Sequence, residues 1–182
     1  QLVNLFRNGE PVRMSKRTGD MITLEEVIDE IGADALRYIL VSKKHTQPID
    51  FDLEVIKKQN SENPVFYIQY AFARINSILK NTGAEIDLNS IQLKAMTDSE
   101  KELLLSVIRF KDEIEQAAQA LDPQKLSAYL LNIAGLFHTF YEKNRVLNNG
   151  EVIKYRVFLI LLVAKVLKEG LSLLGIESPE KM

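Results

Sequence analysis

A short run near the start of the chain combines basic and hydroxyl side chains in a form suited to phosphate chemistry. It consists of Arg13, Met14, Ser15, Lys16 and Arg17, followed by Thr18. Three cations beside two hydroxyl groups can fold over a polyphosphate and neutralise the negative charge that develops during transfer. A solvated basic turn is the alternative, and composition alone favours it.

A second candidate is a stripe of tyrosine and arginine in a helical segment over residues 63–80. Tyr67, Tyr70 and Arg74 recur at gaps of three and four residues, which places them on one helix face. This face lies about 140° from an apolar stripe that predicts the core, made of Val65, Ile68, Phe72, Ile75 and Leu79. Two phenol rings and a guanidinium on one face can stack on unpaired bases and contact phosphate. Tyrosines that only pack between neighbouring helices are an equal alternative.

The helix predicted after Pro123 repeats this arrangement. Its core stripe is predicted to consist of Leu126, Leu130, Ile133, Phe137 and Phe140. His138, Tyr141 and Arg145 follow at gaps of three and four residues. We interpret His138 as a polar surface residue, because no carboxylate partner is evident for it. Two helices that each carry such a stripe are better support for a binding face than either helix alone.

The remaining residues do not build a complete active site. Lys154 and Arg156, at the start of the last predicted helix, could extend a phosphate-binding rim, but ordinary surface positions are the simpler interpretation. No carboxylates are paired for general acid–base chemistry, and no glycine-rich phosphate loop is present. The absence of cysteine excludes disulfides, thiolate metal sites and cysteine nucleophiles. Two histidines are too few for a histidine-rich metal site.

The overall composition is that of an average globular protein. The 182 residues are 46% hydrophobic and 26% charged, with 23 basic and 25 acidic side chains and a formal net charge of −2. This balance excludes a uniformly basic nucleic-acid coat and an acidic disordered tail, but it leaves room for a local basic patch. The longest uncharged run near the C-terminus, residues 157–164, is far too short to cross a membrane.

Turn and capping signals predict a mainly helical chain. Asn8-Gly9 predicts a tight turn between strands at residues 2–6 and 11–14. Thr23 and Thr97 each begin a capping box at the start of a helix. The expected helices cover residues 23–32, 33–42, 63–80, 97–121, 123–148 and 151–174, with an extended piece at 45–52 and a loose connector at 84–96. The predicted fold class is therefore mainly α, an antiparallel helix bundle preceded by a short β-hairpin and loop.

These elements together resemble a known enzyme family. Met14-Ser15-Lys16-Arg17-Thr18-Gly19, followed by Thr23-Leu24, resembles the signature loop of class I aminoacyl-tRNA synthetases. The segment 32–38, Gly-Ala-Asp-Ala-Leu-Arg-Tyr, resembles the Asp-Ala-Leu-Arg element that names one type of anticodon-binding domain. Similarity to arginyl-tRNA synthetase in particular comes from residues 51–53, 63–75 and 174–182. The asparagine–proline–tyrosine-rich helix is the most specific part, and the resemblance spans nearly the whole chain.

The resemblance implies an ATP-dependent ligase that joins arginine to its tRNA through an arginyl-adenylate. In this family the signature loop closes over ATP and stabilises the pyrophosphate leaving group. Lys16 then takes the catalytic-lysine position, with Met14, Ser15 and Arg17 beside it. Arg13 stands where the common Lys-Met-Ser-Lys pattern has its first lysine, a change that keeps the charge but alters the hydrogen-bond geometry. Mg-ATP is the implied cofactor of the full-length enzyme.

The resemblance also implies an RNA partner and a division into three parts. Residues 1–20 would be the end of an α/β catalytic domain, residues 21–60 connecting helices along the inner side of the tRNA, and residues 61–182 the anticodon-binding bundle. The implied contacts to the anticodon stem-loop of arginine tRNA come from Tyr67, Tyr70, Arg74, Tyr141, Arg145 and Met182.

The family's ATP-binding His-Ile-Gly-His element and arginine pocket would lie upstream, in a catalytic domain of the same protein. We therefore expect this chain to bind tRNA without activating arginine, and to bind no ATP alone. The implied full-length enzyme is cytoplasmic, monomeric and not bound to a membrane. A fragment of another class I synthetase, such as the cysteinyl enzyme, is an alternative that the helix at 63–75 argues against. A helical scaffold that binds protein and has no RNA role is the other alternative.

Overall fold

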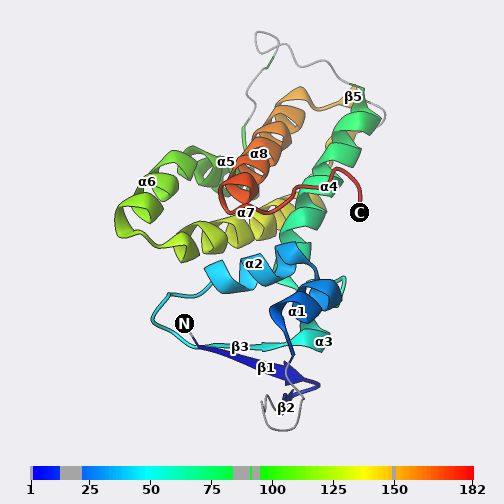
Figure 1. Ribbon diagram of the computed structural model, residues 1–182. Coiled ribbons are helices and arrows are strands. Elements are labelled where there is room, and N and C mark those ends of the chain that lie inside the picture. The colour runs from blue at the N-terminus through cyan, green and yellow to red at the C-terminus, as the bar shows by residue number, and fades with distance from the viewer. Residues whose placement is uncertain (1, 13–21, 84–90, 92–94, 149–150) are drawn as a thin grey trace, which may run out of the picture.

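The computed structural model describes residues 2–12, 22–83, 91, 95–148 and 151–182, and within them the chain is mainly helical (Figure 1). The helices are α1 (Leu24–Ile31), α2 (Ala33–Val41), α3 (Leu53–Ile56), α4 (Pro64–Thr82), α5 (Asp98–Ile108), α6 (Phe110–Ala120), α7 (Pro123–Lys143) and α8 (Lys154–Leu173). The strands are β1 (Val3–Arg7), β2 (Glu10–Pro11), β3 (Ile49–Asp52), β4 (Leu147–Asn148) and β5 (Glu151–Val152). Among the helices of these residues, none combines the length and the apolar character that a bilayer crossing requires.

Three long helices form the centre of the bundle. α4, α7 and α8 pack against one another, while α5 and α6 pack against α7 (Figure 1). The core stripe predicted for α7 is buried in full, and that of α4 is buried except for Leu79, which is partly buried. The sequence signals at the start of α4 act as expected, because the side chain of Asn63 accepts a hydrogen bond from the Phe66 amide and Pro64 occupies the first helical position.

A glycine allows α8 to approach α7 closely. A Cβ atom at Gly170 would collide with the side chain of Leu130, which is itself fully buried. Glycine in a helix is less stable than alanine by about 1 kcal/mol, so its presence here is explained by packing. α7 and α8 are therefore in close contact at this level of the bundle.

The N-terminal hairpin is present, and a third strand extends it into a small sheet. β1 and β2 pair antiparallel around Asn8-Gly9, where both residues have positive φ as a tight hairpin turn requires. The extended piece predicted at 45–52 becomes β3, which pairs in parallel with β1 from Val3↔Ile49 to Phe6↔Asp52. The carboxylate of Asp52 also accepts a hydrogen bond of 2.6 Å from the amide of Gly9. The sheet thus joins residues that lie more than forty positions apart.

The single helix predicted over 97–121 is wrong, because the chain bends at Arg109 between α5 and α6. Side-chain packing against α7 accompanies the bend. The carbonyl of Ser106, the acceptor for Phe110 in an uninterrupted helix, accepts a hydrogen bond of 2.7 Å from the Tyr129 hydroxyl. The rings of Phe110 and Tyr129 stack at 5.8 Å. These contacts hold both α5 and α6 against α7.

The boundary predicted between the last two helices is also shifted. α7 ends at Lys143 instead of near residue 148, because Asn144 is extended and its side-chain amide donates to the Phe140 carbonyl. β4 and β5 then form a short antiparallel pair, so residues 151–152 are a strand and α8 begins only at Lys154. Most of the predicted connector, residues 84–90 and 92–94, lies outside the described residues.

Candidate RNA-binding surface

The two predicted stripes meet where α4 lies against α7. Arg74 Nη1 donates a hydrogen bond of 3.1 Å to the Tyr70 hydroxyl. The guanidinium carbon of Arg74 also lies 5.0 Å from the centre of the Tyr141 ring, a cation–π arrangement. The hydrogen bond with Tyr70 raises the pKa of Arg74 above its already high value, so the group stays charged. One cation is therefore held between two phenol rings from different helices.

These side chains line a surface hollow of about 490 Å³, which we call the tyrosine hollow. Its lining includes Tyr70, Arg74, Asn81, Tyr141, Lys181 and Met182. The last two residues belong to the C-terminus, which runs back along α4 in Figure 1. Tyr70 is 37% exposed and Met182 54% exposed, so both present surface to a ligand. The hollow offers rings, a thioether and two cations within one site.

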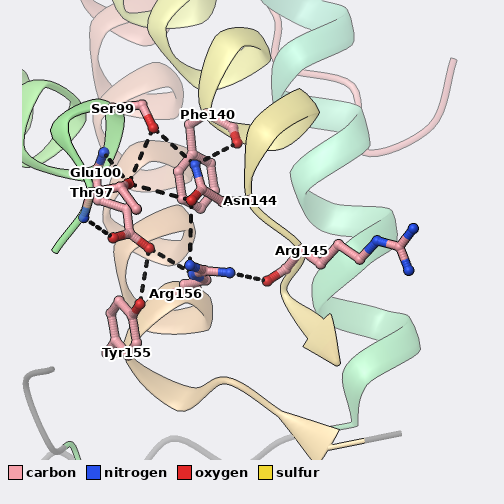
Figure 2. A network of polar contacts seen from close by, with 8 residues as sticks. All are labelled: Thr97, Ser99, Glu100, Phe140, Asn144, Arg145, Tyr155 and Arg156. Carbon is pink, nitrogen blue, oxygen red and sulfur yellow. Dashed lines mark hydrogen bonds and ion pairs between the residues drawn. The ribbon is translucent and has the colours of Figure 1, made fainter. Parts of the chain in front are cut away.

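Arg145 lines a neighbouring hollow that also includes Tyr141. This second hollow has a volume of about 390 Å³ and shares Ile78, Asn81 and Tyr141 with the first. The Arg145 side chain is exposed, and Figure 2 shows it extending away from the buried network behind it. The six residues proposed from the sequence thus come from α4, the end of α7, the turn that follows it and the C-terminus, and five of them line two adjoining hollows.

Tyr67 differs from the other five in its surroundings. It is half-buried, and its ring packs against His138 with centroids 4.6 Å apart. Burial raises the pKa of its hydroxyl group. A third hollow, of about 470 Å³, exposes part of this ring beside Tyr70, His138 and Glu142. Tyr67 therefore packs beside the site and presents only part of its side chain to a ligand.

His138 is not the polar surface residue that the sequence suggested. Its ring is half-buried among Tyr67, Tyr70 and Phe137, with centroid distances of 4.6 to 5.9 Å. Its Nε2 atom is buried, and no described residue gives it a hydrogen-bond partner. Burial lowers the pKa of His138, and the nearby Arg74 cation acts in the same direction. The His138 ring thus packs as an aromatic side chain against Tyr67 and Tyr70.

Arg156 is also not an ordinary surface residue, because it forms a buried ion pair (Figure 2). Its Nε atom lies 2.6 Å from Oε1 of Glu100, whose side chain is fully buried, while that of Arg156 is 16% exposed. Burial favours the neutral acid, but hydrogen bonds from the Thr97 amide, Arg156 and Tyr155 outweigh it and lower the pKa of Glu100. The pair joins the start of α5 to the start of α8.

The same arginine holds the backbone on which Arg145 sits. Arg156 Nη1 donates a hydrogen bond of 2.6 Å to the Arg145 carbonyl, and Nη2 donates to Oδ1 of Asn144. The Asn144 amide in turn donates 2.9 Å to the Ser99 hydroxyl (Figure 2). The turn after α7 is therefore fixed from behind, and the Arg145 side chain points outward from a rigid support.

Several other residues of this surface were not identified from the sequence. Ser77 and Asn81 line the tyrosine hollow and continue the spacing of Tyr70 and Arg74 by gaps of three and four, so that spacing could have identified them. Lys181 carries no comparable signal, because only the path of the folded chain brings it there. The signature-loop residues Arg13, Met14, Ser15, Lys16 and Arg17 lie outside the described residues.

Comparison with known proteins defines the class to which this surface belongs. The profile of the family described as the DALR anticodon binding domain matches residues 68–182. This range contains the tyrosine hollow and most of the bundle. Because the match covers more than half of the chain, the chain belongs to the DALR anticodon-binding domain family.

The more particular relatives are arginine–tRNA ligases. The chain is 45% identical to the enzyme of Desulforamulus reducens and 45% identical to that of Carboxydothermus hydrogenoformans, with all of this chain but 34% of each relative covered. A solved structure from Campylobacter jejuni, described as an arginyl-tRNA synthetase, superposes with a TM-score of 0.89 at 38% identity over 100% of this chain and 40% of its own. The Thermus thermophilus arginyl-tRNA synthetase gives a TM-score of 0.69 at 27% identity, over 92% of this chain and 29% of its own. The resemblance noted in the sequence is confirmed.

Proposed function

We propose that the tyrosine hollow and the adjoining Arg145 hollow bind the anticodon loop of an arginine tRNA. The observation that carries this proposal is the meeting of Tyr70, Arg74 and Tyr141 at one exposed site. Unpaired bases in a loop stack on tyrosine rings and on arginine planes, and their phosphates pair with cations. The family described as anticodon-binding, and the relatives named arginine–tRNA ligase, point to this kind of RNA.

The charges near the hollows suit a loop of RNA more than an extended duplex. Arg74, Arg145 and Lys181 are the cations at the two hollows, while the whole chain has a formal charge of −2. A few cations beside stacking rings can hold a short single-stranded segment. A long duplex would require a broader basic surface, which this composition does not provide. Affinity should therefore come from a small number of nucleotides.

In the whole protein, we propose that this binding serves the attachment of arginine to tRNA with ATP. Lys16 would then be the catalytic lysine of the signature loop, with Arg13, Met14, Ser15 and Arg17 around the phosphates. Such an enzyme acts with the rest of translation in the cytoplasm, and a single polypeptide chain would suffice for one tRNA. The chain described here spans about a third of its curated relatives, and we expect no ATP–pyrophosphate exchange from it alone.

The proposal is tested by binding of the 182-residue chain to two transcripts. One is an arginine tRNA, and the other has the same sequence with a changed anticodon loop. Preference for the native loop supports the proposal. Equal binding to both transcripts, or no binding to either, would contradict it.

A further inference from the structure

We propose that Asp34 and Gln69 are positioning residues that hold the C-terminal tail, residues 176–182, against the tyrosine hollow. This inference rests on the proposed function, because it explains how Lys181 and Met182 come to line an RNA-binding site. The tail lies between α2, α4 and the end of α8 (Figure 1). Its path is set in three steps along the chain, at Gly175, Glu177 and Glu180.

The first step turns the chain out of α8. Gly175 has φ +67, the left-handed conformation that commonly ends a helix, and the Ile176 amide donates back to the Leu171 carbonyl. A Cβ atom at Gly175 would lie 3.2 Å from Nη1 of Arg37, so this close contact with α2 also favours glycine. Ile176 is then buried in the core. The chain therefore leaves α8 directly over the start of α2.

The second step fixes the backbone of Glu177 from both sides. Its amide donates to the Asp34 carboxylate, with distances of 3.2 and 3.3 Å to the two oxygens. Its carbonyl accepts a hydrogen bond of 3.0 Å from Nε2 of Gln69. Nε2 of Gln69 also donates 2.9 Å to Asp34, which ties the two side chains together. Both polar groups of this peptide position are thus bound by a connected pair from α2 and α4.

The third step is weaker and lies nearer the hollow. Lys80, at the end of α4, forms an ion pair of 2.8 Å with Glu180, and both side chains are more than half exposed. Exposed pairs of this kind contribute little to stability. The anchoring of the tail therefore depends mainly on Asp34 and Gln69, which are respectively half-buried and buried. From Glu177, five further residues reach Met182 in the tyrosine hollow.

This arrangement gives two residues of the Asp-Ala-Leu-Arg element a defined role. Ala35 and Leu36 are buried in the core, whereas Asp34 and Arg37 meet the chain at Glu177 and Gly175. These four residues precede the range 68–182 matched by the family profile. An anchored tail presents Lys181 and Met182 to RNA without the loss of conformational freedom that a free tail would suffer on binding. Loss of the anchor should therefore weaken RNA binding without disturbing Tyr70 or Tyr141.

The first test observes the tail without any RNA. Methionine labelled with ¹³C at its methyl group reports Met182 by NMR, with the peak assigned from a chain that lacks residues 181–182. The rings of Tyr70 and Tyr141 line the same hollow, so the peak should be displaced by their ring currents. We expect Asp34→Ala and Gln69→Leu each to move it toward the position of an unstructured methionine. Glu25→Ala is the matched control, because Glu25 is also acidic and in the first turn of its helix.

The second test measures RNA binding as a double-mutant cycle. In the full chain, Asp34→Ala should weaken binding to the arginine tRNA transcript about tenfold, and deletion of residues 181–182 by a similar factor. In the chain already lacking residues 181–182, Asp34→Ala should have no further effect. If Asp34 only stabilises the fold, Asp34→Ala should weaken RNA binding by the same factor in the full chain and in the chain that lacks residues 181–182.

The two tests separate this inference from the proposed function. An unchanged Met182 peak in both Asp34→Ala and Gln69→Leu overturns the inference, as do independent losses in the binding cycle. If the peak moves but the wild-type chain shows no preference for the native anticodon loop, the anchor is supported and the proposed function fails.

Discussion

At the scale of single residues, α4 separates a core face from an exposed face that carries Tyr70 and Arg74. Phe72 is buried, while Tyr70, two positions earlier, is 37% exposed and accepts a hydrogen bond from Arg74 at its hydroxyl. The sequence spacing predicted both faces, because gaps of three and four identify a helix side. It did not reveal that Tyr67 and His138 would form a packed layer beneath Tyr70, since that requires knowing how α4 lies on α7.

The first prediction compares the two aromatic residues. Phe72→Ala should lower the free energy of unfolding by about 3–5 kcal/mol, because it leaves a cavity in the core. Tyr70→Ala should cost much less stability but should reduce the affinity for arginine tRNA, with a loss of about 1–3 kcal/mol for each base that stacks on it. Chemical denaturation and fluorescence anisotropy measure the two effects. Equal destabilisation by both substitutions would contradict the separation into two faces.

The second prediction concerns the pH dependence of stability. The folded state lowers the pKa of His138 below its ordinary value of 6.5, chiefly through burial. Below about pH 6.5 the unfolded chain binds the proton more readily than the folded chain, so the free energy of unfolding decreases as the pH is lowered through that range. Above about pH 6.5 the stability that the neutral ring contributes is fully present. Arg74 strengthens this shift, while Glu142 opposes it. We therefore expect the wild type to lose stability below pH 6.5.

Substitution of the histidine checks this assignment. His138→Phe keeps a ring among the tyrosines but cannot titrate, so its unfolding free energy should change less than that of the wild type between about pH 5 and 6.5. His45→Gln, in an exposed loop, provides the control and should follow the wild type. Identical pH profiles for His138→Phe and the wild type would show that the buried ring is not the group responsible.

At the scale of elements, the buried ion pair of Glu100 and Arg156 joins the start of α5 to the start of α8. Capping signals at Thr97 were readable from sequence, because a capping box is local in the chain. The pairing of Glu100 with Arg156 could not be predicted from the sequence, because the two residues lie 56 positions apart. Arg156 also donates hydrogen bonds to the Arg145 carbonyl and to Asn144, and it thereby supports the turn after α7 from behind.

The third prediction removes one partner of this pair. Arg156→Met leaves a fully buried carboxylate without its cation and should lower the free energy of unfolding by about 3–5 kcal/mol. Lys101→Met breaks the exposed pair with Asp98 on the same helix and should cost less than about 1 kcal/mol. Urea denaturation of both variants gives the comparison. Similar small losses in the two would contradict a structural role for Arg156.

At the scale of the whole molecule, the helical class and the order of the long elements followed from local signals, since a proline marks the start of α4 and α7 and a capping box marks that of α1 and α5. Contacts between segments that are distant in the sequence could not be predicted from such local signals. The parallel pairing of β1 with β3 and the return of the C-terminus to α4 depend on the completed fold. The exposed stripes of tyrosine and arginine were therefore predictable, whereas the position of Lys181 beside them was not.

The central claim is that a few cations and tyrosines at one surface read an anticodon loop. Its most direct test is a salt titration of binding by fluorescence anisotropy, with the arginine tRNA transcript and the transcript with a changed anticodon loop. Each phosphate contact to a single strand contributes about −0.7 to the slope of log affinity against log salt, so contacts from Arg74, Arg145 and Lys181 predict a slope of about −2. Arg74→Ala should make the slope shallower by about 0.7.

The account predicts tighter binding to the native loop at every salt concentration, together with this slope. Lys111→Ala, on α6 at the far side of the bundle from the C-terminus (Figure 1), should leave both unchanged. Binding that ignores the anticodon loop, or a slope that Arg74→Ala leaves unaltered, would contradict the account and would assign the tyrosine stripes to packing alone.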